Sequence, residues 1–320
     1  MTDSVVSAIV VNWNAARELE VCLSSLLAQS YQPLEIIVVD NGSTDDSVHV
    51  VRALGVGWLP LDGNLGLAPA FNRGAKKAAG EFLLFLNNDM RFDANFVESM
   101  VSQIKQDPEI FSVDALQYDW DGCNKVHLAT SIGKKPVGAH DDQLVPGLYI
   151  CQEARDVPTT VLMSSGANML VRKSMFTMLG GFDERLPMSY EDVELCWRAW
   201  IRRWKSIFVP AAVCWHRVGH STQSTGGSRI RFRGTLRGRL LMATKLLPVN
   251  YAIATWWVFL AGLTKDLVCL RRQRVADRIE VLVQSILDLL PLLRERRELY
   301  TSGQVNPSEH LKRLLQLAHV

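Results

Sequence analysis

Polar side chains follow three apolar segments of strand length, at the point where each segment ends. These side chains are Asn12, Asn14, Asp40, Asn88 and Asp89. An unpaired carboxylate is costly at the end of a buried strand unless it is hydrogen-bonded or binds a cation. Asp89 could bind a divalent ion whose coordination is completed by substrate phosphates, as is usual for Mg²⁺. Asp40 could accept hydrogen bonds from a base or ribose, or cap a helix. Any one cluster could be a simple turn, but three together indicate a ligand site.

A second acidic group lies further along the chain, where Glu191 and Asp192 begin a helical pattern. Two acidic residues in a first helical turn could simply complement the helix dipole. A carboxylate held at that position is also suitable as a general base toward a hydroxyl. His216 follows an apolar segment and could contact a metal or a phosphate, or could be structural, because it has no histidine partner one turn away.

The elements that must position these residues alternate between strand and helix over the first hundred residues. Strands without polar alternation, separated by helices, indicate a parallel sheet covered on both faces. The sequence therefore predicts a doubly wound α/β domain, in which ligands bind beyond the carboxyl ends of the strands. Neither G-x-G-x-x-G after the first strand nor a P-loop is present. The expected strands are Val6–Trp13, Leu34–Val39, Val56–Leu61 and Glu81–Leu86; the expected helices include Asp45–Leu54, Ala68–Ala79 and Asp93–Gln106.

The following segment is less regular. Tyr118–Val157 mixes Gly, Pro, Asp and His, which predicts loops and short strands around a pocket. Regular patterns return as a strand at Ser164–Val171, a helix at Tyr190–Trp204 and a strand at Val209–Trp215. We expect residues 1–110 and residues 111–225 to form two halves of the same domain.

Charge separates a third region, residues 226–320. The 320-residue chain has 35 basic and 33 acidic side chains and 48% apolar residues, which excludes an intrinsically disordered protein. Residues 1–225 have a balance of −7 and residues 226–320 a balance of +9. Basic segments commonly meet phosphate or anionic membranes. The six scattered cysteines, without a C-x-x-C pair, suit reduced thiols in a cytoplasmic protein.

The basic region contains an uncharged run, Leu246–Thr264, with paired tryptophans. Its length is borderline for a membrane span. Its interruption by Pro248 and the adjacent arginines fit an interfacial helix, and a helical element of a soluble core stays a third possibility. A later amphipathic helix is expected at Ile279–Leu293.

Seven segments, in this order, resemble glycosyltransferase family 2. The resemblance covers residues 5–222, and its nearest branch is that of the bacterial rhamnosyltransferases. It implies a nucleotide-sugar-binding fold of GT-A type with a C-terminal helical extension at 226–320. Within that fold, residues 1–110 would be the nucleotide-sugar-binding half and residues 111–225 the acceptor-binding and catalytic half of the same domain. The segments are Val6–Asn14, Ile37–Ser47, Gly63–Gly74, Phe85–Asp89, Gly180–Glu184, Tyr190–Arg198 and Val209–His216.

The resemblance implies a role for each candidate residue. Asp192, paired with Glu191, would be the base of an inverting displacement, and Asp89 with His216 would hold Mg²⁺ or Mn²⁺ on the diphosphate. Many relatives have Asp-x-Asp where this chain has Asn87-Asn88-Asp89, so one expected carboxylate is replaced by an amide. The residues that would bind the nucleotide sugar are Asn12, Asn14, Asp40, Asn64, Asn72 and Asn88.

The expected donor is dTDP-rhamnose or a UDP-sugar, and the expected acceptor a lipid-linked or cell-envelope glycan. We expect a protein peripheral on the inner face of the cytoplasmic membrane and no nucleic-acid partner, because the arginine cluster lacks interleaved stacking aromatics. Two alternatives stay open: an inactive nucleotide-sugar-binding partner protein, and a sugar nucleotidyltransferase. The second would need a Gly-rich phosphate loop where Asn12-Trp13-Asn14 stands, and it would release pyrophosphate rather than nucleoside diphosphate.

Overall fold

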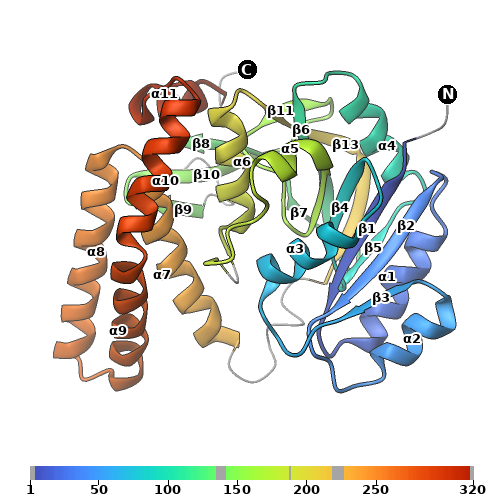
Figure 1. The fold of residues 1–320 in the computed structure, drawn as a ribbon, viewed down its shortest axis with the longest axis horizontal. Coiled ribbons are helices and arrows are strands. Elements are labelled where there is room, and N and C mark those ends of the chain that lie inside the picture. Colours follow the sequence, from blue (N-terminus) through green and yellow to red (C-terminus); the bar gives the residue numbers. More distant parts are fainter. Residues whose placement is uncertain (1–3, 135–141, 187–188, 218–226, 318–320) are drawn as a thin grey trace.

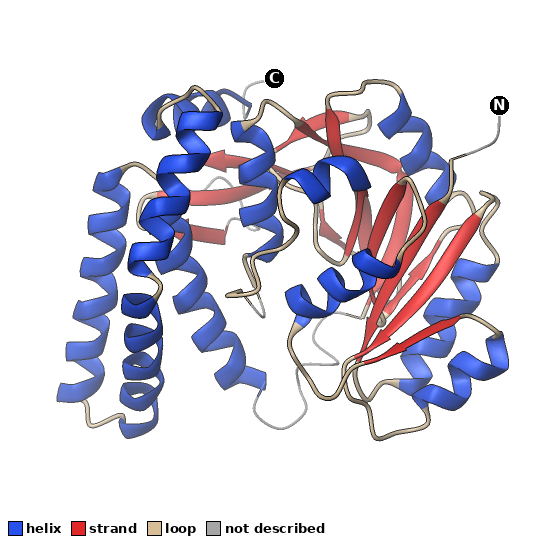
Figure 2. Ribbon diagram, in the orientation of Figure 1, coloured by secondary structure: helices blue, strands red, loops and turns tan. Residues whose placement is uncertain are grey.

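The protein is built around one large mixed sheet, with most helices packed on its two faces (Figures 1 and 2). The computed structural model describes residues 4–134, 142–186, 189–217 and 227–317. The strand order is β11-β13-β6-β12-β4-β1-β2-β3, with β5 paired to β13 and β7 to β6. A small antiparallel sheet, β8-β10-β9, lies apart from it.

The first half follows the predicted alternation closely. Strands β1, β2, β3 and β4 run parallel, in the order β4-β1-β2-β3. Helices α1, α2 and α4 contribute to the apolar core on one face, and α3 contributes to the core on the other. The elements are β1 (Val6–Asn12), α1 (Ala16–Leu27), β2 (Leu34–Asp40), α2 (Ser47–Leu54), β3 (Gly57–Pro60), α3 (Leu67–Lys77), β4 (Phe82–Asn87), β5 (Met90–Phe92) and α4 (Phe96–Lys105).

The second half contains elements that the sequence pattern did not reveal. A buried ten-residue strand, β6 (Ile110–Asp119), lies parallel to β13 (Lys205–His216). Strand β12 (Asn168–Arg172) is inserted antiparallel between β4 and β6, so the sheet is mixed. The remaining elements are β7 (Lys125–His127), β8 (Ala129–Gly133), β9 (Asp142–Val145), β10 (Leu148–Glu153), β11 (Thr159–Val161), α5 (Lys173–Met178) and α6 (Glu191–Ile201).

Five C-terminal helices stand beside α6 and form what we call the helical layer (left side of Figure 1). The layer is anchored because Met242, Leu246 and Leu314 belong to the same buried core as α3 and α6. Its helices are α7 (Gly227–Leu246), α8 (Val249–Val268), α9 (Arg272–Leu287), α10 (Leu289–Ser302) and α11 (Pro307–Gln316).

Two expectations for this region need correction. The uncharged run Leu246–Thr264 is divided at Pro248: Leu246 is fully buried, whereas α8 begins at Val249. The single helix predicted at Ile279–Leu293 is two helices that meet at Asp288. In the described part of the chain no helix combines the length and the apolar character that a bilayer crossing requires.

Candidate active site

The carboxyl ends of β1, β2 and β4 bring three of the predicted residues together. Asn12 stands opposite Asp40 in the parallel register, and both are buried. The Asn12 amide nitrogen lies 3.4 Å from Asp40 Oδ1, and its oxygen accepts a 2.7 Å hydrogen bond from the Asn88 amide. The sequence-predicted cluster at this edge is thus one hydrogen-bonded network.

Asp40 shapes the loop after β2 rather than capping α2. Its Oδ2 accepts a hydrogen bond from the Ser43 backbone N–H at 3.1 Å. Asp46, not Asp40, is the residue that precedes α2. Gly42 has a φ of +82°, and a Cβ there would lie 2.7 Å from the Cα of Gly63, so the loops after β2 and β3 touch through glycine backbone.

Asn14 and Asn64 hold these same loops from either side. Asn14 Oδ1 accepts a 2.7 Å hydrogen bond from the Thr44 N–H. Asn64 Oδ1 accepts from the Asn41 amide at 3.0 Å and from the Gly66 N–H at 3.0 Å. Both predicted residues therefore lie at the edge formed by the carboxyl ends of the parallel strands, and their amide oxygens already accept hydrogen bonds from the protein.

Asn72 lies in α3 and connects this helix to the Gly180–Glu184 segment. Its oxygen accepts from the Phe182 N–H at 3.0 Å, and its nitrogen donates to the Phe182 carbonyl at 2.9 Å and to Glu184 at 3.1 Å. The structure thus gives Asn72 a full set of protein partners and joins two motifs that are 110 residues apart.

Asp89 and His216 meet across strands β5 and β13, which pair antiparallel. His216 Nε2 lies 3.2 Å from Asp89 Oδ1, while its Nδ1 lies 3.2 Å from Gln117 Oε1. Asp89 is 3% exposed, and Oδ1 has no hydrogen-bond partner in spite of this proximity. A buried carboxylate oxygen without a donor, beside an imidazole nitrogen, fits a divalent cation.

This pair offers two ligands only. The described residues contain no group of three or more His, Cys, Asp or Glu side chains arranged for a metal. A cation here would draw its remaining ligands from diphosphate oxygens and water, the arrangement typical of Mg²⁺ with nucleotide substrates.

Glu191 and Asp192 begin α6 at the same edge of the sheet. Asp192 is partly exposed, and its oxygens accept from the N–H groups of Gly166 at 3.0 Å and Val193 at 2.8 Å. Glu191 is 5% exposed, and its Oε2 has no partner. Burial raises the pKa of Glu191 to about 8, with the Asp192 charge adding to the rise.

Burial also raises the pKa of Asp192, but the two backbone donors and His127 oppose that rise. The two neighbours therefore divide their roles. Glu191 holds a proton near neutral pH, whereas Asp192 is the better stabilised anion and has access to solvent.

Backbone contacts bring the two carboxylate groups to one place. The Asn87 N–H donates to the Ala167 carbonyl at 3.1 Å, and the neighbouring Gly166 N–H donates to Asp192. Strand β12 starts just after this segment, so its antiparallel insertion beside β4 is what brings Asp192 to the edge that carries Asp89.

Sequence reasoning missed Asp114 and His127, which are buried beside Asp192. His127 Nε2 lies 2.7 Å from Asp114 Oδ2. Both residues sit in the segment where β6 and β7 were not recognised, so no strand end pointed to them. A sequence signal existed only in the placement of a carboxylate inside an apolar run, Ile110–Leu116.

Similarity to known proteins agrees with this geometry. The family model "Glycosyl transferase family 2" matches residues 7–179. The N-acetylglucosaminyl-diphospho-decaprenol L-rhamnosyltransferase of Mycobacterium tuberculosis is 28% identical over 77% of this chain and 94% of its own length. The poly-beta-1,6-N-acetyl-D-glucosamine synthase of Staphylococcus aureus is 25% identical over 78% of this chain and 61% of its own length.

Solved structures share the fold. The mannosyltransferase from Pyrobaculum calidifontis, in complex with GDP-Man and Mn²⁺, superposes with a TM-score of 0.56 at 18% identity, over 98% of this chain and 86% of its own. GalNAc-T7 with UDP, GalNAc and Mn²⁺ gives 0.59 at 17% identity, over 77% and 48%.

The fold and the edge of acidic and amide residues define a GT-A glycosyltransferase. The chain belongs to glycosyl transferase family 2, as the motifs predicted, and the rhamnosyltransferase among its relatives agrees with the branch they indicated.

Proposed function

We propose that the protein transfers a sugar with inversion from a nucleoside-diphosphate donor to a hydroxyl of a glycan, with a divalent metal. The observation that carries the proposal is that one backbone segment, Gly166-Ala167, bonds both to Asp192 and to Asn87, two residues before Asp89. Asp89 is left without a hydrogen-bond donor on Oδ1, and Asp192 is partly exposed and accepts two backbone hydrogen bonds.

The nucleotide would lie over the loops after β1, β2 and β3. Asp40 would accept hydrogen bonds from the base, with Asn12 and Asn14 beside the nucleoside and Asn64, Asn88 and Asn72 toward the sugar. Because several of these amides already bond to protein, we expect them to position the loops as much as to contact the donor. The glycine contact between Gly42 and Gly63 lets the backbone approach the donor closely.

The reaction would be a displacement at the anomeric carbon. Asp192 accepts the proton of the acceptor hydroxyl. The hydroxyl oxygen attacks the anomeric carbon from the face opposite the diphosphate, which leaves, so the configuration is inverted. Neighbouring Glu191, held protonated by burial, keeps a second negative charge away from the attacking oxygen. A Mg²⁺ or Mn²⁺ ion held by Asp89 and His216 would supply neutralisation of charge on the departing nucleoside diphosphate.

The names of the relatives support a particular donor and acceptor. The mycobacterial relative is an L-rhamnosyltransferase whose name specifies a lipid diphosphate acceptor. We therefore propose dTDP-rhamnose first and a UDP-sugar second, with a lipid-linked or cell-envelope glycan as acceptor. Residues 1–110 would bind the donor, and residues 111–225 would supply the base.

A donor panel tests the proposal. Purified protein is incubated with dTDP-, UDP- and GDP-sugars and Mg²⁺ or Mn²⁺, with and without a lipid-diphosphate glycan, and the nucleotide products are resolved. Release of nucleoside diphosphate supports a transferase. Pyrophosphate release would instead identify a nucleotidyltransferase, and donor binding without turnover would indicate an inactive partner protein.

Asp89→Asn tests the metal. We expect turnover to fall about 100-fold or more and the metal dependence of nucleotide affinity to disappear, because a carboxylate ligand is lost. Asp93→Asn, which alters an exposed carboxylate four residues away, is the matched control and should retain turnover. Full activity of the wild type in EDTA would refute metal dependence.

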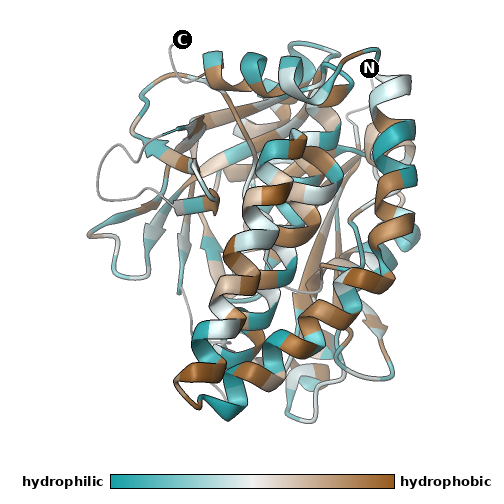
Figure 3. Cartoon of the chain, turned by 90° about the vertical axis from the view of Figure 1, so that its left-hand side faces the viewer, coloured by the Kyte–Doolittle hydropathy of each residue, from teal (hydrophilic) through white to brown (hydrophobic). Residues whose placement is uncertain are grey.

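The helical layer supports membrane association through an unusual distribution of its side chains. The buried side of α9 contains Asp277 and Ser285 around a single apolar residue, Val281. Its apolar side chains Ile279, Val283, Ile286 and Leu287 are between 48% and 72% exposed. In α8, Trp257 is 72% exposed while Asp266 is buried (Figure 3 shows apolar stretches along these helices).

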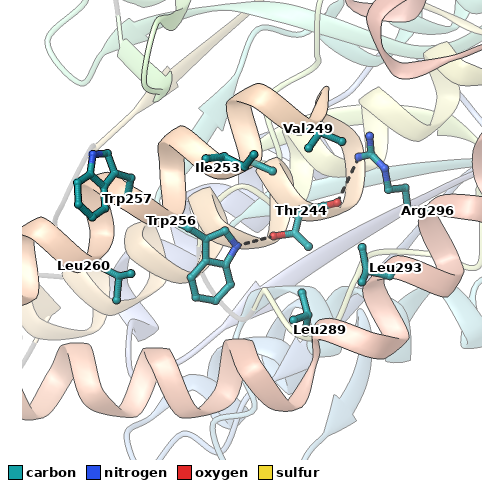
Figure 4. Close-up of a pocket in the computed structure, with 10 residues that line it drawn as sticks. Thr244, Val249, Ile253, Trp256, Trp257, Leu260, Leu289, Leu293 and Arg296 are labelled. Atoms are coloured by element: carbon teal, nitrogen blue, oxygen red, sulfur yellow. Dashed lines mark hydrogen bonds between the residues drawn. The ribbon is translucent and has the colours of Figure 1, made fainter.

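A groove between α8 and α10 extends this apolar surface. It has a volume of about 630 Å³, and Trp256, Trp257, Leu260, Leu289 and Leu293 are among its lining residues (Figure 4). Arg296 closes one end, where it donates to the carbonyls of Thr244 and Leu247. An outward apolar face with tryptophan, in a region of charge +9, matches the chemistry of an anionic bilayer surface.

We therefore propose that α8, α9 and α10 place the protein on the inner face of the cytoplasmic membrane. Flotation with phosphatidylglycerol-containing vesicles tests this. The double variant Trp257→Ser/Val258→Ser should lose most of the bound fraction. Val157→Ser removes a similarly exposed apolar side chain (64%) from the α/β domain and should leave the bound fraction unchanged. Equal binding of both variants, or formation of a dimer that buries this face, would overturn the membrane proposal.

A further inference from the structure

A buried pair of ionisable side chains, Asp114 and His127, lies beside Asp192 and takes no part in the reaction proposed above. Asp114, in β6, is fully buried, and His127, in β7, is 9% exposed. Nε2 of the histidine lies 2.7 Å from Oδ2 of the carboxylate. Burying two ionisable groups is costly unless they are paired and their remaining polar atoms also have partners, so the groups that surround this pair matter.

The backbone of Ser165 and Gly166 connects this pair to Asp192. The Ser165 N–H donates to Asp114 Oδ1 at 3.1 Å, and the next N–H, that of Gly166, donates to Asp192 Oδ2 at 3.0 Å. Two consecutive amides are thus each held by one carboxylate. A shift of Asp114 would turn the peptide that orients Asp192.

The charges around the cluster reinforce this link. Burial lowers the pKa of His127, but the negative charges of Asp114 and Asp192 outweigh it and raise the pKa above its ordinary value. The other titratable groups that act here are Glu191 and Cys196 in α6 and Cys214 in β13. Burial raises the pKa of Glu191 and of both thiols, so these three are protonated at neutral pH.

We infer that Asp114 and His127 are positioning residues for Asp192: the pair fixes the Ser165–Gly166 backbone that orients the carboxylate and compensates its negative charge. Neither residue is assigned a contact with substrate. The inference rests on the proposed role of Asp192 as base. It adds that residues of β6 and β7 orient this residue of α6 and lower the cost of its negative charge.

The coupling is tested first without any substrate. The seven histidines are titrated by NMR in the full-length protein, and the His127 signal is identified by its loss in His127→Gln. In Asp192→Asn the titration midpoint of His127 should fall by about one pH unit, because a neighbouring negative charge is removed. Thr130→Val, a substitution in β8 that removes a buried hydrogen bond to the Met163 carbonyl, should leave the His127 midpoint unchanged. An unchanged midpoint in Asp192→Asn would overturn the inference.

Enzyme kinetics provide the second test. In His127→Gln the acid limb of the kcat profile should move to higher pH by about one unit, because a positive charge beside Asp192 is removed, while KM for the donor changes little. A uniform loss of kcat at every pH, without a shift of the limb, would indicate a purely structural pair and refute the inference. Absence of turnover by the wild type with every donor would count against the proposed function, and the NMR result would still decide this one.

Discussion

Two buried carboxylates at the candidate active site differ in their partners from a third at the joint between the helical layer and the α/β domain. At the active-site edge, Asp89 Oδ1 and Glu191 Oε2 are buried and accept no hydrogen bond. Where the helical layer meets the α/β domain, Asp183 is held by Arg185 at 2.6 Å and by Lys245 at 2.8 Å. A buried charge without a partner is expensive. The difference therefore separates the carboxylates proposed to act in the reaction from one that joins two parts of the fold.

Lys245 is the centre of the joining network. Its ammonium, 5% exposed, contacts Asp183, Glu194 at 2.7 Å and Glu295 at 3.1 Å. Glu194 lies two residues after Asp192 in α6, so the basic C-terminal region is connected directly to the helix that carries the proposed base. Burial would raise the pKa of Asp183, but Arg185 and Lys245 outweigh it and hold the pKa well below its usual range.

The largest expected effect separates the two classes by activity. Asp192→Asn should lower turnover by about a thousandfold, because a general base contributes 10²–10⁴-fold, while nucleotide affinity stays close to that of the wild type. Product formation and nucleotide binding by calorimetry are measured on the same preparation. Turnover at the wild-type rate would remove Asp192 from the mechanism.

The second prediction breaks the joining network. Lys245→Met leaves three carboxylates around an apolar side chain and should cost about 3 kcal/mol of unfolding free energy, the lower end for a broken buried pair because Arg185 and Arg198 stay. Urea denaturation measures it. Lys205→Met removes a lysine whose ion pair with Asp107 is half-exposed, and it should cost much less. Equal losses in the two variants would show that Lys245 has no special role.

The third prediction uses pH. The folded pKa of Glu191 is about 8, above its unfolded value, so the folded state binds the extra proton and stability falls as pH rises from about 4.5 to 8. Glu191→Gln removes this dependence. Its unfolding free energy should match that of the wild type near pH 4.5 and exceed it above pH 7. Between these values the difference should grow by up to ~1.4 kcal/mol per pH unit, as measured by urea denaturation at each pH. A gap independent of pH would contradict the assignment.

The smallest effect is expected inside the helical layer. Arg313 pairs with Glu309 one turn away in α11, and both side chains are about half-exposed, so Arg313→Met should cost about 1 kcal/mol or less of unfolding free energy. Urea denaturation again gives the value. A loss as large as that of Lys245→Met would mean that the layer depends on its internal pairs as strongly as on its joint with α6.

Much of the first half of the fold was predictable because strand and helix alternate there with short loops. Asp40 and Asn12 could be placed together from sequence, since parallel strands bring their carboxyl ends to one edge. Strand β6 escaped recognition, and Asp114 with it, because the apolar run after α4 carries no turn signal to delimit it. The exposure of the apolar face of α9 could not be predicted either, because periodicity marks an apolar stripe but does not say whether that stripe is buried.

The sequence by itself determined the family, the parallel strands of the first half and the identity of the acidic and amide residues, because these follow from local patterns and ordered motifs. Only the tertiary structure decided which side chain each carboxylate lies beside. Asp89 meets His216 across 127 residues of sequence, and Asp183 meets Lys245 across 62. Such distances are set by strand order and helix packing, which bring residues together irrespective of spacing, and burial then fixes which of them keep a proton.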